Sequence, residues 1–272
     1  MVSSLRHSQF FYTTAPLPCP YLPNRTERKI IADLAVPQAD ALHSRLSRAG
    51  FRRSHTLAYA PMCENCTACI PIRLPVNRFT PDRTQKRTIR RNADLRATLV
   101  PPLATPEQYA LFARYQDTRH TDGEMASMTA TEYRTMVEDT PVQTLLAEFR
   151  TAEQTLIATC LIDQLEDGLS AVYSFYEPDA PQRSLGSFVI LALIEKTKSL
   201  GLPYLYLGYW VRGSAKMTYK SRYRPAEIPH HGTWQDLNPE HPPEGAQGGA
   251  ISKTTLPGKN FSSKPPSSTS SL

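Results

Sequence analysis

Three cysteines at two-residue spacing are the residues of this chain best suited to soft-metal or thiol chemistry. Cys63, Cys66 and Cys69 lie close enough in sequence to ligate one ion. Cys19, in a separate loop, could supply a fourth ligand, and four thiolates suit a zinc ion or an iron–sulfur cluster. The alternative is a tight turn whose small thiols pack as apolar groups, because the second C-x2-C pair of an ordinary zinc site is missing.

A dense cationic segment, residues 73–91, follows the cysteines and contains seven basic side chains but one acid. The residues that we expect to bind phosphates share one predicted helix: Lys86, Arg87, Arg90 and Arg91. Helix positions three and four apart lie on the same face, so these side chains form a cationic stripe. Such a stripe binds nucleic-acid phosphates with little sequence selectivity, although most charge runs are solvated helix faces. Interleaved prolines favour RNA ends and loops over a DNA duplex.

Tyrosines and cations are interleaved between residues 204 and 224. Side chains in this arrangement can stack on bases while they pair with phosphates. Alternation along a strand places Tyr204 and Tyr206 in the core. The residues that remain as candidates for function are Tyr209, Tyr219 and Lys220. The alternative is a strand that contributes only core residues, next to a basic surface.

A turn at residues 182–188 begins a predicted helix directly after a strand. Main-chain N–H groups at such a turn attract anionic or strongly polar ligands, which makes Ser184 and Gly186 candidate binding residues. The turn half matches the R-x-x-G-x-[G/A] loop by which Gcn5-related acetyltransferases hold coenzyme A. Arg183 and Gly186 fit this loop, but Phe188 stands where a small residue should be. We expect the phenyl ring to obstruct the phosphates of coenzyme A.

The elements that position these groups are predicted by periodicity and by helix and turn signals. Helices are expected over 37–49, 106–120, 129–139 and 188–200, with another that begins after Thr84. Strands are expected over 51–59, 70–76, 142–149, 155–165, 170–176 and 204–210, with a strand or a short helix over 28–34. This order indicates an α+β fold, in which helices pack on a mostly antiparallel sheet.

Length and composition limit the class of protein. The 272 residues are 40% hydrophobic and 21% charged, as in an ordinary globular protein. We expect an N-terminal domain over 1–100, a second domain over 101–238 and a disordered tail over 239–272. The net charge of +6 favours acidic partners such as nucleic acid. The sequence has neither a membrane-length apolar run nor a secretory signal, so we expect a cytoplasmic protein with reduced cysteines.

Several distinctive motifs follow one another from Cys19 to Pro229. In the first half these are C-P-Y-L-P-N-R at 19–25, the cysteine-containing run from Arg52 to Arg73, and F-T-P-D-R-T-Q-K-R at 79–87. In the second half they are H-T-D-G-E-M at 120–125, Y-S-F-Y at 173–176, S-L-G-S-F at 184–188, Y-L-G-Y-W at 206–210 and K-M-T-Y-K-S-R-Y-R-P at 216–225. Together they resemble the arginyl-tRNA–protein transferase family, and within it the bacterial aspartate/glutamate leucyltransferases.

The resemblance implies an enzyme that moves leucine from its co-substrate, leucyl-tRNA, to the N-terminal amine of proteins that begin with Asp or Glu. The added leucine would mark the protein for degradation as an N-degron, and the cationic stripe would steer tRNA. The Gcn5-related acyltransferase fold is implied for the second half of the chain. No cofactor is required by this chemistry. Eukaryotic relatives can hold an iron–sulfur cluster with a C-G-Y-C motif and a Cys-Cys pair, but here Leu22 replaces the second cysteine of that motif.

Attack of an amine on an activated ester depends on alignment and on stabilisation of the oxyanion more than on covalent catalysis. The acceptor amine has a pKa of about 7.7–8.0, so a useful fraction is neutral near pH 7. The side chains that we expect around the reacting centre are Tyr173, Tyr219 and Lys220. An acidic N-terminus requires a cation, for which Arg73 and Arg222 are candidates. The predicted substrate site is completed by Ser184, Gly186, Tyr209 and Trp210.

Three other functions stay open at the level of sequence. An arginyl-tRNA–protein transferase would use the same chemistry with another donor amino acid. A coenzyme A-dependent N-acyltransferase would share the fold but needs a small residue at position 188. A non-catalytic, zinc-containing RNA-binding module would explain residues 63–91 but leaves residues 142–224 without a role. Neither DNA nor a membrane is an expected partner.

Overall fold

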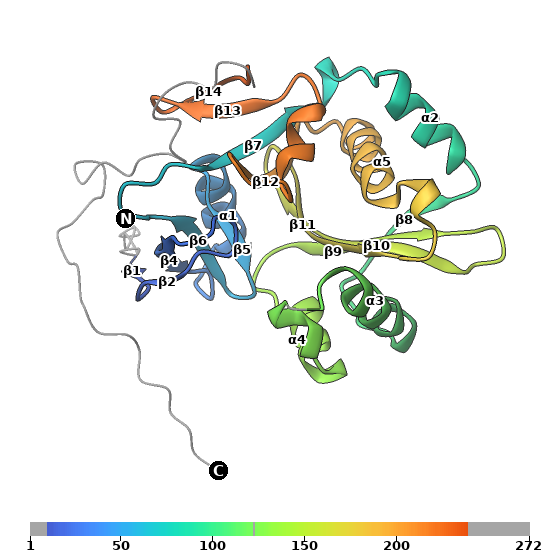
Figure 1. The fold of residues 1–272 in the computed structure, drawn as a ribbon, viewed down its shortest axis with the longest axis horizontal. Helices are drawn as coiled ribbons and strands as arrows, with labels where there is room; N and C mark the ends of the chain where they lie inside the picture. Colours follow the sequence, from blue (N-terminus) through green and yellow to red (C-terminus); the bar gives the residue numbers. More distant parts are fainter. Residues whose placement is uncertain (1–9, 122, 239–272) are drawn as a thin grey trace, which may run out of the picture.

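A computed structural model of the chain describes residues 10–121 and 123–238, which form two main sheets (Figure 1). The tail predicted over 239–272 lies outside the described residues. The smaller sheet consists, in order, of β1 (Phe11–Thr13), β4 (Lys29–Asp33), β6 (Leu57–Pro61) and β5 (Arg52–Ser54). A short ribbon pairs β2 (Leu17–Pro18) with β3 (Thr26–Glu27). The expected strand over 51–59 is therefore a hairpin of two strands, β5 and β6.

The larger sheet is mixed but mostly antiparallel. It consists, in order, of β14 (Thr233–Asp236), β13 (Glu227–His230), β7 (Cys69–Pro75), β12 (Tyr204–Val211), β11 (Gly168–Tyr176), β10 (Leu156–Leu165), β9 (Thr144–Arg150) and β8 (Arg96–Val100). All of its pairings are antiparallel except the one between β11 and β12. The sheet confirms the α+β class that the sequence predicts. Strands β8, β13 and β14 are absent from the sequence prediction.

Helices cover both faces of the larger sheet. They are α1 (Ala39–Arg48), α2 (Arg83–Arg91), α3 (Pro106–Arg119), α4 (Ala130–Glu138) and α5 (Leu185–Ser199). Helix α5 packs on one face with α2 beside it, and α3 packs on the other face with α4 (Figure 1). Short 3-10 helices are η1 (Val76–Arg78), η2 (Glu124–Ser127), η3 (Pro181–Arg183) and η4 (Thr218–Arg222). In the described part of the chain, no helix is long and apolar enough to cross a bilayer.

Three of the helices begin with a capping box. In this motif the side chains of the cap residue and of the third helical residue each accept a hydrogen bond from the main-chain N–H of the other residue. The pairs are Asp82 with Gln85 in α2, Thr105 with Gln108 in α3, and Thr129 with Glu132 in α4. Helix α2 therefore begins at Arg83, slightly earlier than the sequence predicts. The capping boxes fix where these helices start and thus which residues they expose.

Strand β7 brings a segment of the first hundred residues into the sheet of the second half. It pairs along its length with β12. Its pairing with β13 is limited to Arg73 opposite Glu227, because the flanking residues Pro71 and Pro75 have no N–H to donate. The larger sheet thus takes strands from both sides of residue 100, and the predicted domain division at that point stays a prediction.

A buried ionic cluster joins the smaller sheet to the larger one. Asp163 of β10 is fully buried and accepts two hydrogen bonds of 2.7 Å from Arg53 of β5. Its carboxylate also accepts a bond of 2.9 Å from the Thr144 hydroxyl and lies 3.0 Å from Nε2 of His43 in α1. Burial alone would raise the pKa of Asp163, but the bonds from His43 and Arg53 outweigh it and lower the pKa to about 2. This carboxylate therefore holds α1 and β5 against the larger sheet.

The substitution Asp163→Asn should lower the free energy of unfolding by about 3–5 kcal/mol, because a neutral amide leaves the buried guanidinium of Arg53 without a counter-charge. Urea denaturation followed by circular dichroism measures this loss. Asp94→Asn is the matched control, since Asp94 pairs with Arg183 but has a side chain that is 52% exposed. The control substitution should lower the free energy of unfolding by less than about 1 kcal/mol. A similarly small cost for Asp163→Asn would show that the cluster does not hold the two sheets together.

Candidate active site

The larger sheet is open between β11 and β12. These parallel strands are paired only between residues 168–170 and 204–206. Farther along, β12 shifts its register against β7 next to Gly208, whose φ is +77°. Residues 171–176 and 207–211 are consequently not paired with each other. Main-chain carbonyls of β11 in this stretch are available to groups other than a neighbouring strand.

Arg52 of β5 enters this opening. Its Nη2 donates hydrogen bonds to the main-chain oxygens of Ala171 and Val172, at 3.0 and 3.1 Å. Gly208 makes room for the guanidinium, because a Cβ at this position would lie 2.4 Å from Nη1 of Arg52. Nη1 itself is buried and has no hydrogen-bond partner among the described residues. Arg52 is not among the site residues predicted from the sequence, because nothing in its local pattern distinguishes it from the neighbouring Arg53.

Lys220 of η4 lies within electrostatic reach of Arg52. Its side chain is buried, and Nζ donates a hydrogen bond of 2.9 Å to the main-chain oxygen of Tyr209. Burial, together with the charge of Arg52, lowers the pKa of Lys220 to about 7. Near neutral pH a substantial fraction of this side chain is therefore a free amine. A lysine in this state can accept a proton from a reacting group.

The two tyrosines predicted to be catalytic lie near the same opening. Tyr173 of β11 is half-buried, and its hydroxyl accepts a hydrogen bond of 2.6 Å from Nε2 of Gln116. Tyr219 is 40% exposed, and its ring centre lies 5.9 Å from Nζ of Lys220. Tyr173 and Tyr219 are both within electrostatic reach of the buried Tyr115. Tyr219 and Lys220 therefore lie together, and Tyr173 shares the neighbour Tyr115 with Tyr219.

Tyr209 and Trp210, predicted to bind substrate, are both buried. The Tyr209 hydroxyl lies within donating distance of the main-chain oxygens of Gly50 (2.9 Å) and Tyr59 (3.1 Å). Trp210 belongs to the main hydrophobic core. Tyr209 contributes to the site through its carbonyl, which holds Lys220, while its ring anchors β12 to the smaller sheet.

The turn before α5 differs from the sequence prediction in one respect. Phe188 is buried and packs against Phe149, with ring centres 5.8 Å apart, so the expectation that it obstructs phosphates is wrong. Tyr176 lies against Gly186 instead, since a Cβ at Gly186 would be 3.0 Å from its ring. Ser184 is exposed and precedes α5 with a φ of +52°. A ligand at this turn would therefore meet an aromatic ring.

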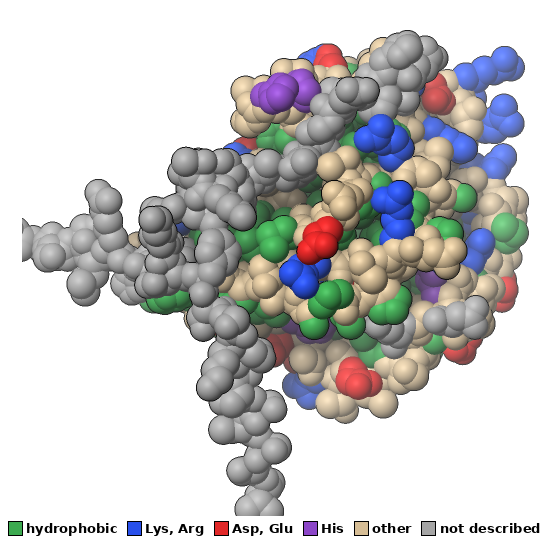
Figure 2. Space-filling view, turned by 60° about the vertical axis from the view of Figure 1, so that its left-hand side comes forward, with side chains coloured by type: hydrophobic (Ala, Val, Ile, Leu, Met, Phe, Trp, Pro, Cys, Tyr) green, Lys and Arg blue, Asp and Glu red, His purple; other side chains and the backbone are tan. Residues whose placement is uncertain are grey.

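The cationic stripe lies on α2, as the sequence predicts. Its exposed members are Arg83, Lys86, Arg87, Arg90 and Arg91. At 100° per residue they cover an arc of about 140°, opposite the buried Gln85 and Thr88. In the described part of the chain no carboxylate is paired with Lys86, Arg87 or Arg90. Figure 2 shows lysine and arginine side chains along the upper right of the molecule, with few acidic ones between them.

The two cations predicted to bind a carboxylate have different surroundings. Arg73 is buried, and its Nε donates a hydrogen bond of 2.9 Å to Glu227. The guanidinium carbon also lies 3.5 Å from the ring centre of Tyr204, so this charge is already neutralised within the sheet. Arg222 is exposed, and its main-chain oxygen accepts a hydrogen bond of 3.3 Å from Gln85 of α2. This bond links the element that contains Lys220 to the cationic helix.

The four predicted metal ligands line one cavity of about 60 Å³: Cys19, Cys63, Cys66 and Cys69. Burial, followed by the proximity of the other three thiols, raises the pKa of Cys69 to about 12. Among the described residues, no three His, Cys, Asp or Glu side chains are arranged to hold a metal ion. The metal site that the sequence predicts at these cysteines therefore stays a prediction.

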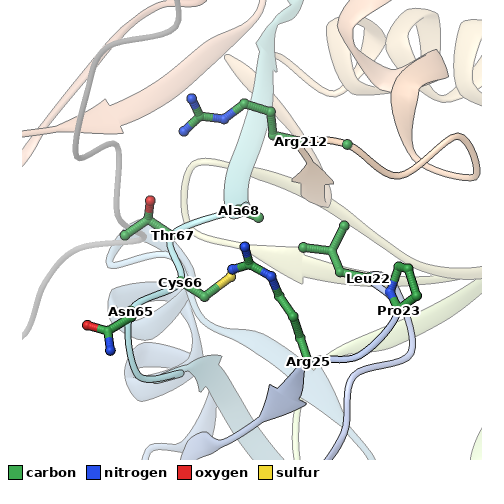
Figure 3. A pocket seen from close by; sticks show the side chains of 9 residues that line it. Leu22, Pro23, Arg25, Asn65, Cys66, Thr67, Ala68 and Arg212 are labelled. Carbon is green, nitrogen blue, oxygen red and sulfur yellow. The ribbon is translucent and has the colours of Figure 1, made fainter.

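A larger, open cavity of about 440 Å³ adjoins the cysteines and shares Leu22, Arg25 and Cys66 with the smaller one. Figure 3 shows the side chains of Arg25 and Arg212 in this cavity, each coming from a different segment. Arg212 directly follows β12, and its N–H donates to the main-chain oxygen of Ala68 at 3.0 Å. The described residues that line the cavity include no carboxylate. Two guanidinium groups in such a setting suit an anionic ligand.

Comparison with known proteins identifies relatives of the chain. The family models described as Arginine-tRNA-protein transferase, N terminus, and Arginine-tRNA-protein transferase, C terminus, match residues 17–87 and 107–230. The aspartate/glutamate leucyltransferase of Gluconacetobacter diazotrophicus is 59% identical over 242 residues, which are 89% of this chain and 93% of that protein. The protein of the same name from Paramagnetospirillum magneticum is 52% identical, over 86% of this chain and 96% of that protein. Among solved structures, L-PGS from Bacillus licheniformis is similar with a TM-score of 0.41 and 13% identity, over 52% of this chain and 45% of that chain.

Replacement of Lys86, Arg87 and Arg90 by Ala should weaken RNA binding and make it less sensitive to salt. Each lost phosphate contact lowers the slope of log K against log salt by about 0.7–0.9, so the slope should fall by about 2–3. Fluorescence anisotropy with a tRNA transcript at several NaCl concentrations measures both quantities. A triple variant with the same charge loss elsewhere, at Arg45, Arg134 and Lys198, is the control. If both variants lose the same slope, α2 is not a specific RNA-binding surface.

Proposed function

This chain belongs to the arginine-tRNA-protein transferase family, and from that premise we propose that it transfers leucine from leucyl-tRNA to the N-terminal amine of proteins that begin with Asp or Glu. The observation that carries the proposal is the 59% identity to an aspartate/glutamate leucyltransferase over 89% of this chain. The family resemblance of the sequence motifs is thereby confirmed, and with it the transferase class. We further propose that the leucine acts as an N-degron and that the reaction takes place in the cytoplasm.

In the proposed reaction, the acceptor amine attacks the ester carbonyl of leucyl-tRNA. A peptide bond forms, the ester C–O bond breaks, and its electron pair goes to the ribose oxygen. Lys220 in its free-amine form accepts the proton that the attacking nitrogen loses and passes it to the ribose oxygen. A pKa of about 7 supports this role as a base, because an ordinary lysine would be fully protonated.

Tyr173 and Tyr219 supply hydrogen-bond donors in this proposal. Burial raises the pKa of Tyr173, so its hydroxyl stays protonated at neutral pH. Gln116 fixes the position of that hydroxyl through the bond of 2.6 Å. Tyr219, which is more exposed, would contact the substrates where they enter. Both side chains would align the amine with the ester carbonyl.

The acidic residue of the acceptor needs a cation, and three exposed arginines are candidates. Arg222 lies two residues from Lys220, and Arg25 and Arg212 flank the cavity of about 440 Å³. Arg73 is the weaker candidate, because Glu227 already neutralises it. The phosphates of tRNA would contact the cationic stripe of α2, which Gln85 joins to η4.

The proposed reaction requires no metal and no organic cofactor, only leucyl-tRNA as co-substrate. A zinc ion or an iron–sulfur cluster bound by Cys19, Cys63, Cys66 and Cys69 stays a prediction of the sequence. Elemental analysis of protein purified without chelators would decide it, and less than about one tenth of an equivalent of zinc or iron would reject it.

Purified protein should transfer leucine from radiolabelled leucyl-tRNA to peptides that begin with Asp or Glu, and not to a peptide that begins with Ala. Arginyl-tRNA is tested in parallel as the alternative donor. Transfer of arginine in place of leucine would keep the reaction class and change the donor. Absence of transfer from both, by folded and reduced protein, would reject the proposed function in favour of RNA binding alone.

The same assay separates the candidate cations. Loss of the cation that binds the acidic residue should lower transfer to an Asp peptide by about 10-fold or more and leave the small transfer to a neutral peptide unchanged. The variants to compare are Arg222→Ala and the double variant Arg25→Ala with Arg212→Ala. If a variant lowers transfer equally for both peptides, the replaced arginine is not the cation that binds the acidic residue.

Lys220→Met should lower kcat by about 100-fold or more, because the general base is lost. In the unaltered chain, kcat should rise with pH through about 7, since Lys220 accepts a proton only above its pKa. In the variant the rise near pH 7 should be absent, which leaves only the rise due to the acceptor amine at about pH 7.7–8.0. Lys216→Met, at an exposed lysine of the same segment, is the matched control. An unchanged kcat and pH profile in Lys220→Met would remove this residue from the chemistry.

A further inference from the structure

The guanidinium of Arg52 differs from the other buried guanidinium groups of the sheets. Arg53 is paired with Asp163, and Arg73 is paired with Glu227. Nη1 of Arg52 is buried and has no hydrogen-bond partner in the described part of the chain. A buried donor without a partner costs about 1–3 kcal/mol of stability, and more when it is charged. A charge kept in this state is a candidate for a ligand that arrives from outside.

Arg52 is held in one position before any ligand binds. Two carbonyls of β11 fix Nη2, at 3.0 and 3.1 Å. The other side of the guanidinium lies against Gly208, where no side chain could fit. Donors that are already oriented stabilise developing charge without reorganisation during the reaction. Arg52 meets this requirement in the opening between β11 and β12.

The surroundings of Arg52 are those of the proposed catalytic residues. Its charge acts on Lys220, Tyr209 and Tyr219, which come from η4 and β12. Tyr219 is 40% exposed, so this group of side chains reaches the surface. A substrate placed beside Lys220 would therefore also lie close to Arg52.

We propose that Nη1 of Arg52 donates a hydrogen bond to the carbonyl oxygen of the transferred aminoacyl ester and stabilises the oxyanion that forms when the amine attacks. This inference rests on the proposed function. As the C–N bond forms, the carbonyl electron pair moves to the oxygen that faces Arg52. When the carbonyl re-forms, the ester C–O bond breaks and the ribose oxygen leaves with that bond's electron pair. Lys220 accepts the proton that the attacking nitrogen loses and passes it to the ribose oxygen.

A carboxylate of the acceptor is the less suitable ligand for this nitrogen. Guanidinium groups bind carboxylates through two parallel N–H donors. In Arg52 the second terminal nitrogen already bonds to Ala171 and Val172. Nη1 is then the one terminal nitrogen left without a partner, and it matches one oxygen atom, which is what a tetrahedral intermediate presents.

The test is the steady-state kinetics of Arg52→Lys and Arg52→Ala with leucyl-tRNA and an Asp peptide. Loss of one oxyanion donor lowers kcat by about 100–1,000-fold. The KM for each substrate should change by less than about threefold, because the bond strengthens only in the transition state. Millimolar guanidinium ion should restore part of the kcat of Arg52→Ala and should not affect a variant that keeps Arg52. Circular dichroism and the melting temperature establish that each variant is folded. If Arg52→Ala is unstable, Arg52→Lys serves in its place, because lysine keeps the positive charge and the aliphatic part of the side chain.

Arg134→Lys and Arg134→Ala are the matched controls, since Arg134 is an exposed arginine of α4, and both should behave as the unaltered chain. A kcat within about threefold of the unaltered chain in folded Arg52→Lys would overturn the inference. So would a loss confined to the KM of acidic peptides, which would assign Arg52 to the acceptor carboxylate. If the unaltered chain transfers no aminoacyl group, the proposed function fails first and the inference fails with it.

Discussion

The salt bridge between Arg53 and Asp163 is the constraint on which the candidate active site depends. It fixes β5 of the smaller sheet against β10 of the larger one, with both carboxylate oxygens engaged at 2.7 Å. Adjacent residues of a strand point to opposite sides. Because the side chain of Arg53 points toward Asp163, the side chain of its neighbour Arg52 must point the other way, into the opening between β11 and β12. The buried Arg53 thus determines the position of Arg52, the proposed oxyanion donor.

Burial disfavours the charged form of both Asp163 and Lys220, but the net results are opposite because their partners differ. Asp163 has Arg53, His43 and a hydroxyl around it, so its charged form is favoured in spite of desolvation. Lys220 has a carbonyl as its acceptor and the like charge of Arg52 nearby, so its charged form is disfavoured. One cluster thereby remains ionised and rigid, while the other contains an amine that can exchange a proton. The site needs both properties, and they come from the same two neighbouring arginines.

The sequence predicts what depends on local pattern. The α2 stripe, the order of helices and strands in the second half, and the convergence of four cysteines follow from spacing, periodicity and motifs. Arg73 and Arg52 could not be interpreted in this way. The partner of Arg73 is Glu227, 154 residues farther along the chain, in a strand that the sequence does not reveal. Arg52 acquires its environment from β11 and from Gly208, both of which are distant in sequence.

The turn before α5 explains why phosphates would be bound by side chains in this chain and not by a helix N-terminus. Tyr176 covers Gly186, and the guanidinium of Arg183 is engaged by Asn92 and Asp94 at the end of α2. Asn92 also donates to the main-chain oxygen of Arg183, so the turn is tied to the cationic helix. Coenzyme A presents one pyrophosphate, which a single helix start can hold. A folded RNA presents phosphates over a wide surface, and the exposed arginines and lysine of α2 match that distribution.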